Sequence, residues 1–87
     1  MIADICLLAF ILHEVKKPEY LIAEASRLLK PGGKIIIVEW RADLNSPGPP
    51  HQKRISNEQI KQLSEKVGLA MVSHLEWSDN HYIAICE

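Results

Sequence analysis

The chain has 87 residues, enough for one small domain with a narrow stability margin. Its 10 Lys and Arg residues nearly balance its 11 Asp and Glu residues. This balance lacks the positive excess that is typical of proteins binding nucleic acids or acidic membrane surfaces, so we expect neither partner.

The first predicted element is a strand from Ile2 to Phe10, an apolar run interrupted by Asp4. The run is far shorter than the about 18 to 20 residues that cross a bilayer, and it lacks the flanks of a signal peptide. Because it is apolar on both faces, the pattern favours a central strand of a sheet covered by helices on each side.

A helix and a second strand follow. Pro18 suits a first helical turn, and the apolar residues from Leu21 to Leu29 recur at helical spacing. Pro31 and the pair Gly32-Gly33 predict the end of the helix and a turn before a strand from Lys34 to Trp40. A helix between two strands indicates a parallel pair with a right-handed crossover.

The segment 45–50, Asn-Ser-Pro-Gly-Pro-Pro, is a predicted loop. After it, residues 56–59 form a capping box, with Ile55 and Ile60 placed as a hydrophobic staple for a helix that ends at Gly68. Two strands, about residues 70–75 and 81–86, are joined by a linker short enough for an antiparallel hairpin.

Two segments resemble a known family. The run LLKPGGKIIIVEW at residues 28–40 resembles the helix-to-fifth-strand junction of class I S-adenosylmethionine-dependent methyltransferases, and residues 10–15 lie at the matching distance before it. The resemblance implies an α/β fold: a partial Rossmann-like methyltransferase sheet with two parallel strands and a crossover helix, plus a C-terminal helix and antiparallel hairpin. Residues 1–87 would form a single domain matching the C-terminal half of that fold, with strand order first, second, fourth, third.

Ligands of open α/β sheets bind beyond the carboxyl ends of the parallel strands, which here are residues 10–14 and 39–41. The resemblance implies S-adenosylmethionine as methyl donor, bound near Ala9, Phe10 and Leu12. It also implies a small-molecule acceptor beside His13 and Glu39, the predicted catalytic residues. The predicted acceptor-binding residues are Trp40, Arg41 and His51, the last in a loop that could close over the crevice. We expect no metal.

Each residue also has a structural interpretation. His13 suits proton transfer near neutral pH, but it could instead cap a short helix or bond to the backbone. A carboxylate such as Glu39 after a buried strand requires water, a ligand or a hydrogen-bond donor. Trp40 could shape an acceptor pocket, attract a sulfonium centre or pack under the following loop.

The glycine-rich turn that holds the donor in the family cannot be placed in this sequence, because Gly32-Gly33 precedes a strand instead of a helix. We therefore expect weak or no donor binding by this chain alone. The first strand would then be an apolar sheet edge, which predicts a homodimer through that edge or a complementing partner. Three interpretations stay open: a truncated methyltransferase, a noncatalytic pairing module, and an unrelated small enzyme or ligand binder.

Cys6 and Cys86 are far apart in apolar runs without metal-ligand spacing, which favours reduced thiols and a cytoplasmic protein.

Overall fold

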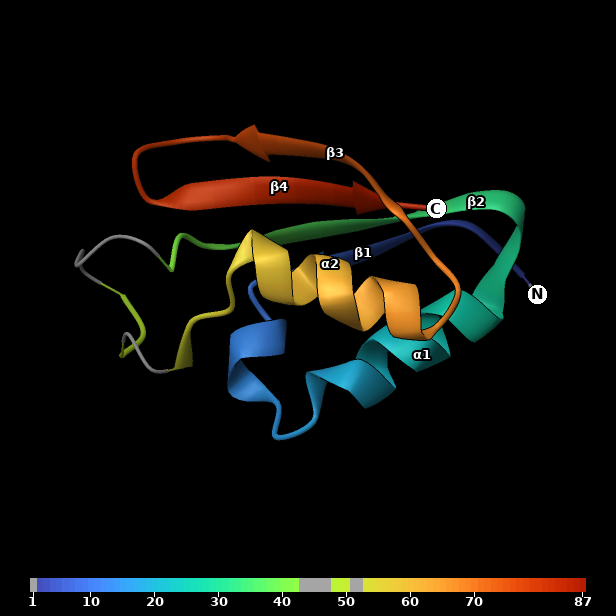
Figure 1. Cartoon of the computed structure of the whole chain (residues 1–87), viewed down its shortest axis with the longest axis horizontal. Helices are drawn as coiled ribbons and strands as arrows, with labels where there is room; N and C mark the ends of the chain where they lie inside the picture. Colours follow the sequence, from blue (N-terminus) through green and yellow to red (C-terminus); the bar gives the residue numbers. More distant parts are fainter. Residues whose placement is uncertain (1, 43–47, 51–52) are drawn as a thin grey trace.

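The computed structural model describes residues 2–42, 48–50 and 53–87. One mixed sheet carries both helices of these residues on the same face (Figure 1). The elements are β1 (Ala3–Ala9), the short 3-10 helix η1 (Leu12–Glu14), α1 (Pro18–Leu28), β2 (Leu29–Trp40), α2 (Asn57–Lys66), β3 (Met71–Glu76) and β4 (His81–Cys86). The sheet order is β1-β2-β4-β3, in which β1 and β2 are parallel and β4 is antiparallel to β2 and to β3. The predicted fold class and strand order are confirmed.

The boundary between α1 and β2 differs from the prediction. Pro18 lies in the first turn of α1 as expected, but β2 begins at Leu29 and not at Lys34. Leu29 is buried and pairs with Ala3, which extends the ladder upstream of the glycines. The register then shifts, so that the next pair is Ile5 with Lys34 and residues 30–33 form an irregular stretch within the strand.

The capping box of α2 is confirmed. The Ser56 side chain accepts a hydrogen bond from the Gln59 backbone N–H, and the Gln59 side chain accepts one from the Ser56 backbone N–H. Ile55 and Ile60 are both buried, as the staple requires. After the helix, Gly68 has a φ of +83°, a conformation that side-chain-bearing residues rarely adopt.

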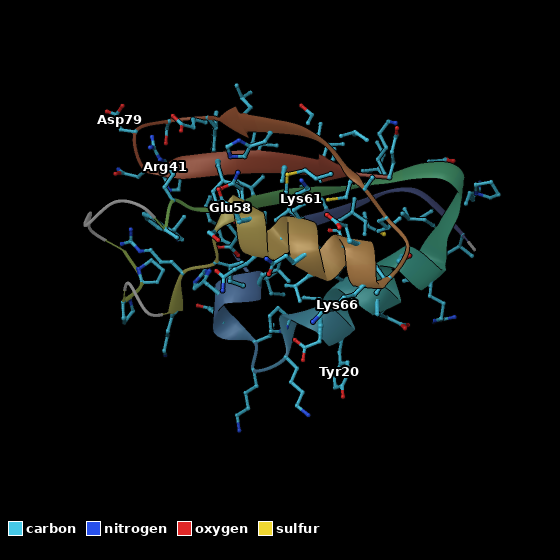
Figure 2. All side chains as sticks on the ribbon, viewed as in Figure 1. Tyr20, Arg41, Glu58, Lys61, Lys66 and Asp79 are labelled. Atoms are coloured by element: carbon cyan, nitrogen blue, oxygen red, sulfur yellow. The ribbon has the colours of Figure 1, made fainter. Side chains whose placement is uncertain are left out.

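The core lies between the helical layer and one face of the sheet. In β4 the buried residues alternate with partly exposed ones, because successive strand side chains point to opposite faces. The buried apolar residues are Leu12, Ile22, Ala25, Leu29, Ile35, Ile37, Ile55, Ile60, Tyr82, Ala84 and Cys86. Tyr20 lies on the outer side of this layer (Figure 2), with 65% of its surface exposed.

The other face of the sheet is open. Ile5 and Leu7 of β1 are 58% and 62% exposed, and Leu75 of β3 is 58% exposed. The prediction that the first strand is central and covered on both sides is therefore wrong for this chain, in which β1 is an edge strand covered on one face. The expectation of an apolar edge strand is confirmed. Within the described residues, no helix is long and apolar enough to cross a membrane.

Replacement of a side chain on the covered face should destabilise the fold far more than replacement on the open face. Ile37 is fully buried, so Ile37→Ala should lower the free energy of unfolding by about 2 to 5 kcal/mol. The matched variant Ile5→Ala, on the open face, should lower it by less than about 1 kcal/mol. Urea denaturation at low protein concentration measures both, and equal losses would contradict the one-sided core.

Candidate functional site

The candidate site lies at the carboxyl ends of β1 and β2. Because the two strands are parallel and Ala9 pairs with Val38, both end at the same edge of the sheet. Phe10, with a φ of +57°, turns the chain out of β1 into η1, which carries His13. Glu39 is the next residue of β2 after this last pair. The sheet thus brings together two side chains that are 26 positions apart in sequence.

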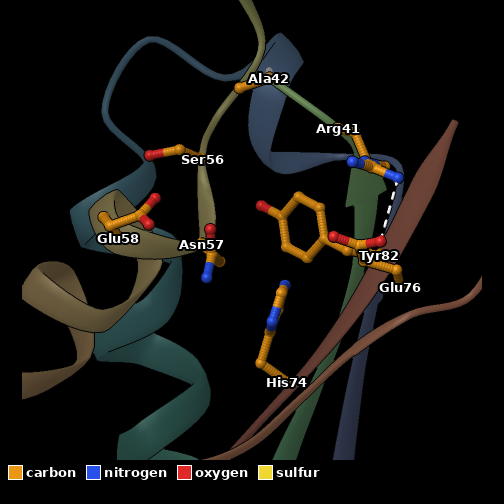
Figure 3. A pocket seen from close by; sticks show the side chains of 8 residues that line it. All are labelled: Arg41, Ala42, Ser56, Asn57, Glu58, His74, Glu76 and Tyr82. Atoms are coloured by element: carbon orange, nitrogen blue, oxygen red, sulfur yellow. Dashed lines mark hydrogen bonds and ion pairs between the residues drawn. The ribbon is translucent and has the colours of Figure 1, made fainter. Parts of the chain in front are cut away.

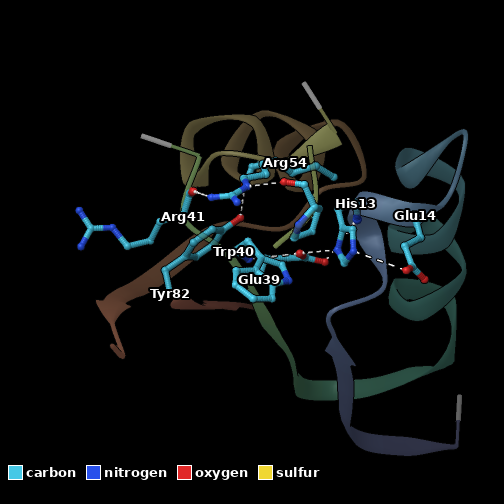
Figure 4. A network of polar contacts seen from close by, with 9 residues as sticks. His13, Glu14, Glu39, Trp40, Arg41, Arg54 and Tyr82 are labelled. Carbon is cyan, nitrogen blue, oxygen red and sulfur yellow. Dashed lines mark hydrogen bonds and ion pairs between the residues drawn. The ribbon is translucent and has the colours of Figure 1, made fainter. Parts of the chain in front are cut away.

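His13 and Glu39 form a buried pair (Figure 4). The His13 Nδ1 and Glu39 Oε1 atoms are 2.9 Å apart, and the side chains are 7% and 0% exposed. Glu39 also accepts backbone hydrogen bonds from His13, at 3.3 Å to Oε2, and from Trp40, at 3.3 Å to Oε1. The expectation that Glu39 requires hydrogen-bond donors is therefore met inside the protein.

The pair favours one tautomer of the imidazole ring. A carboxylate can only accept hydrogen bonds, so a bond from His13 to a carboxylate at Glu39 places the proton on Nδ1. In the neutral ring this leaves the lone pair on Nε2, the nitrogen that points away from Glu39. Nε2 lies 3.6 Å from the carboxylate of Glu14, a side chain that is 71% exposed. The ring bond of His13 is thus to a carboxylate, and not to the backbone as the structural interpretation had it.

The Trp40 ring is packed against neighbouring side chains and the following loop. Its ring lies 4.4 Å from the His81 ring and 6.1 Å from the Phe10 ring, measured between centroids, and the Arg54 guanidinium carbon is 5.6 Å from its centre. A Cβ atom at Gly48 would come within 2.8 Å of the Trp40 ring, so the described part of the following loop lies against it. This arrangement supports packing under the loop.

The remaining predicted site residues are dispersed. Arg41 extends away from His13 (Figure 4), and its Nη1 atom lies 3.1 Å from Glu76 Oε2. Ala9 is exposed and Phe10 is 36% exposed at the end of β1, whereas Leu12 is fully buried in the core. A donor contact by residue 12 would therefore have to come from its backbone. His51 lies outside the described residues.

Two polar residues near the pair, Arg54 and Tyr82, were not predicted as site residues from the sequence. Together with His13, Glu39 and Trp40 they form the polar network drawn in Figure 4. The Arg54 Nε atom donates to the Pro49 carbonyl at 3.0 Å, and its Nη1 atom donates to the Arg41 carbonyl at 3.2 Å. The Tyr82 hydroxyl donates to the Ile55 carbonyl at 2.5 Å. Alternation along β4 could have placed Tyr82 on the covered face. The run Arg54-Ile55-Ser56 after the proline-rich segment resembles a loop that covers the acceptor site in some methyltransferases, but Arg54 itself was not predicted as a site residue.

Burial raises the pKa of the Tyr82 phenol, and the charges of Glu39 and then Glu58 raise it further. The hydroxyl therefore stays protonated and can keep donating to Ile55 well above neutral pH. Burial likewise raises the pKa of the Cys86 thiol, against the lowering effect of its bond with Ser64.

Two cavities flank the network. One, of about 480 Å³, is called here the His13 cavity, and His13, Glu14, Lys16, Lys53, Arg54 and Gln59 are among its lining residues. The other, of about 290 Å³, is called the His74 cavity; Figure 3 shows it between His74 and Glu76 on one side and Asn57 and Glu58 on the other. In the described ranges, no group of three or more His, Cys, Asp or Glu side chains is placed to hold a metal ion.

Comparisons with known proteins agree with the fold. Residues 2–37 match a family described as a methyltransferase domain. An S-adenosylmethionine-dependent methyltransferase from Aquifex aeolicus superposes on 97% of this chain with a TM-score of 0.85 and 23% identity. A type 11 methyltransferase, named as putative, from Sulfolobus solfataricus superposes on 98% with a TM-score of 0.83 and 22% identity. An O-methyltransferase family 2 protein from Planctomyces limnophilus, in complex with apigenin, superposes on the whole chain with a TM-score of 0.79 and 25% identity.

The chain spans less than half the length of these proteins. It covers 45% of the Aquifex chain, 49% of the Sulfolobus chain and 31% of the Planctomyces chain. No curated protein matches the sequence. The comparisons thus support a class I methyltransferase-like fold, present here over part of the length of its relatives.

Tyr82→Phe should destabilise the protein by about 1 to 3 kcal/mol, because the buried Ile55 carbonyl loses its donor. It should also change the alkaline limb of the stability profile. Tyr82 ionises above about pH 10 in the unfolded chain, whereas in the folded protein it stays protonated. The wild type therefore loses stability as the pH rises above about 10, because ionisation favours the unfolded chain. Tyr82→Phe has no phenol to ionise at this position and should not show this loss.

The matched control is Tyr20→Phe, at an exposed position, which should leave both quantities near those of the wild type. Chemical denaturation between pH 7 and 11 measures all three proteins. Identical alkaline slopes for the wild type and Tyr82→Phe would show that the phenol is not held in its protonated form.

Proposed function

We propose that this chain, which is class I methyltransferase-like in fold over its length and in sequence over residues 2–37, supplies the acceptor side of a methyl transfer from S-adenosylmethionine to a small molecule. The observation that carries the proposal is the buried His13–Glu39 pair at the carboxyl ends of two parallel strands. In this sheet class, ligands bind at that edge.

His13 is the proposed general base. Glu39 holds the ring with Nδ1 protonated, so Nε2 is the nitrogen that can take a proton from an acceptor oxygen, nitrogen or sulfur. As that proton arrives, the ring becomes cationic, and the adjacent Glu39 carboxylate stabilises the positive charge. The bound donor would supply the methyl group, leaving as a neutral thioether when the acceptor atom forms its new bond to carbon.

The described residues fit one side of a donor site. Ala9 and Phe10 leave an accessible wall at the end of β1. The glycines do not provide the other side, since Gly32 and Gly33 lie within β2, Gly48 packs on Trp40 and Gly68 follows α2. We therefore derive no donor geometry, and assign the rest of that site to sequence corresponding to the part of the Aquifex enzyme outside the match.

The open edge of β1 favours a second proposal, a pairing role. A strand edge flanked by exposed Ile5 and Leu7 offers unpaired backbone groups and apolar surface to another chain. Such a contact would join two copies of this chain, or this chain and a complementing partner. The free thiols Cys6 and Cys86 suit a cytoplasmic setting, which we include in the proposal.

Removal of the base should abolish transfer. In a fusion that places this chain behind the unmatched part of the Aquifex enzyme, His13→Ala should lower the transfer rate by at least about 100-fold. Glu39→Gln should lower it too, because the neutral amide cannot stabilise the charged ring. Mass spectrometry of methylated acceptors measures the rate, and His74→Ala, an exposed site, is the control. A folded, donor-binding fusion in which His13→Ala keeps the full rate would exclude His13 as the base.

The 87-residue chain alone should show no saturable binding of S-adenosylmethionine or S-adenosylhomocysteine in titration calorimetry, because it provides one wall of the donor site. Micromolar binding would instead mean that these residues, or a pair of chains, form a complete donor site.

Association should depend on β1. Light scattering over a range of concentrations should show a mass above that of the 9.9 kDa monomer, and Leu7→Lys should reduce it. Leu75→Lys is the matched control, since Leu75 is similarly exposed but lies on β3, at the other edge of the sheet. A monomeric wild type, or equal effects of the two variants, would argue against pairing through β1.

A further inference from the structure

The His13 cavity has the size and composition of a small-molecule site. Its volume of about 480 Å³ lies within the range of ligand pockets in proteins. Apolar side chains, namely Leu12, Val15, Pro18 and Ile55, form part of its wall. His13 lines the same cavity, so a molecule bound there has access to the ring that carries the proposed base.

The charged residues of the wall are predominantly cationic. Lys16, in the turn between η1 and α1, and Lys53 and Arg54, in the segment before α2, line the cavity together with one carboxylate, that of Glu14. The whole chain is nearly neutral, with a formal charge of −1, so this concentration of positive charge is local. It is assembled from two segments that are far apart in sequence.

The His74 cavity provides an internal contrast. Its wall has one cation, Arg41, and two carboxylates, Glu58 and Glu76. The two cavities thus differ in the sign of their fixed charge, although both lie beside the polar network that includes Tyr82 and Ile55. Clefts lined by one sign of charge attract ligands of the opposite sign.

We propose that the acceptor bound in the His13 cavity is anionic, carrying a carboxylate or a similar group that Lys16 and Lys53 select, while Arg54 adds positive charge to the wall. This inference rests on the function proposed above. The apolar wall accommodates the body of the acceptor, and its nucleophilic atom reaches Nε2 of His13. The Glu14 carboxylate oxygen already lies 3.6 Å from Nε2, at the place where an oxygen of the acceptor would bind. The Glu14 side chain is exposed, so it can rotate away when the acceptor enters.

The cationic wall would also assist proton transfer. Positive groups near an acceptor hydroxyl favour its ionised form, so they make the proton easier for His13 to remove. The same groups hold the acceptor by charge-assisted hydrogen bonds, which are stronger than neutral ones. Recognition and activation would therefore depend on the same two lysines, Lys16 and Lys53.

The test measures binding without the donor, on the purified 87-residue chain. The probes are 4-hydroxybenzoate, an anion, and its methyl ester, a neutral analogue of nearly the same shape. Calorimetry or amide chemical shifts should show the anion binding about tenfold more tightly than the ester at low salt, with the preference falling as salt is added. The double variant Lys16→Gln/Lys53→Gln should reduce the preference to near parity.

The matched control is Lys61→Gln/Lys66→Gln, two exposed lysines of α2 that do not line the cavity, and it should keep the wild-type preference. Equal binding of both probes, no binding of either, or an unchanged preference in the Lys16/Lys53 variant would overturn the proposal. If the anion preference holds but the fusion protein transfers no methyl group, the cavity is an anion site and the proposed reaction fails separately.

Discussion

The burial of one carboxylate constrains the site and much of the sheet around it. Glu39 has no exposed surface, and three hydrogen-bond donors reach its carboxyl group. Two of these donors belong to His13, which is held there by η1 after β1. These hydrogen bonds to the buried carboxyl group therefore require that β1 and β2 be paired and that η1 be formed. The same contacts orient the imidazole ring, so one arrangement satisfies the buried carboxyl group and positions the proposed base.

In the described residues, helices cover one face of the sheet, although the other face is apolar too. Parallel strands such as β1 and β2 are usually apolar on both faces because helices pack on each. In this chain α1 and α2 occupy a single face, and the opposite face leaves Ile5, Leu7 and Leu75 accessible. The chain matches about half of the length of the Aquifex and Sulfolobus proteins.

Local signals in the sequence predicted most of the fold. The capping box at Ser56 and the hairpin ending at Cys86 depend on neighbouring residues, and both are found where expected. The start of β2 was missed because Pro31, Gly32 and Gly33 are turn formers in isolation. The burial of Leu29 against the core and its pairing with Ala3 are tertiary effects that local propensity does not include.

The site was partly predictable for a similar reason. A carboxylate after a buried strand signals a need for donors, and the parallel topology indicated His13 as a neighbour. The placement of Leu12 in the core depends on how η1 leaves the sheet, and the position of Arg54 depends on carbonyl groups of a loop. Neither the path of η1 nor that of the loop is encoded in a short pattern.

The pairing of His13 with Glu39 has a consequence for strand register. Residues 35–38 of β2 are three isoleucines and a valine, so a slip of one residue would exchange one apolar set for another at little hydrophobic penalty. The same slip would turn Glu39 towards the open face, away from the His13 donors, and would direct Val38 or Trp40 into its place. The slip would also turn the exposed Lys34 onto the covered face, so the two polar residues at the ends of this run distinguish the correct alignment from its nearest competitor, which the apolar residues alone cannot do.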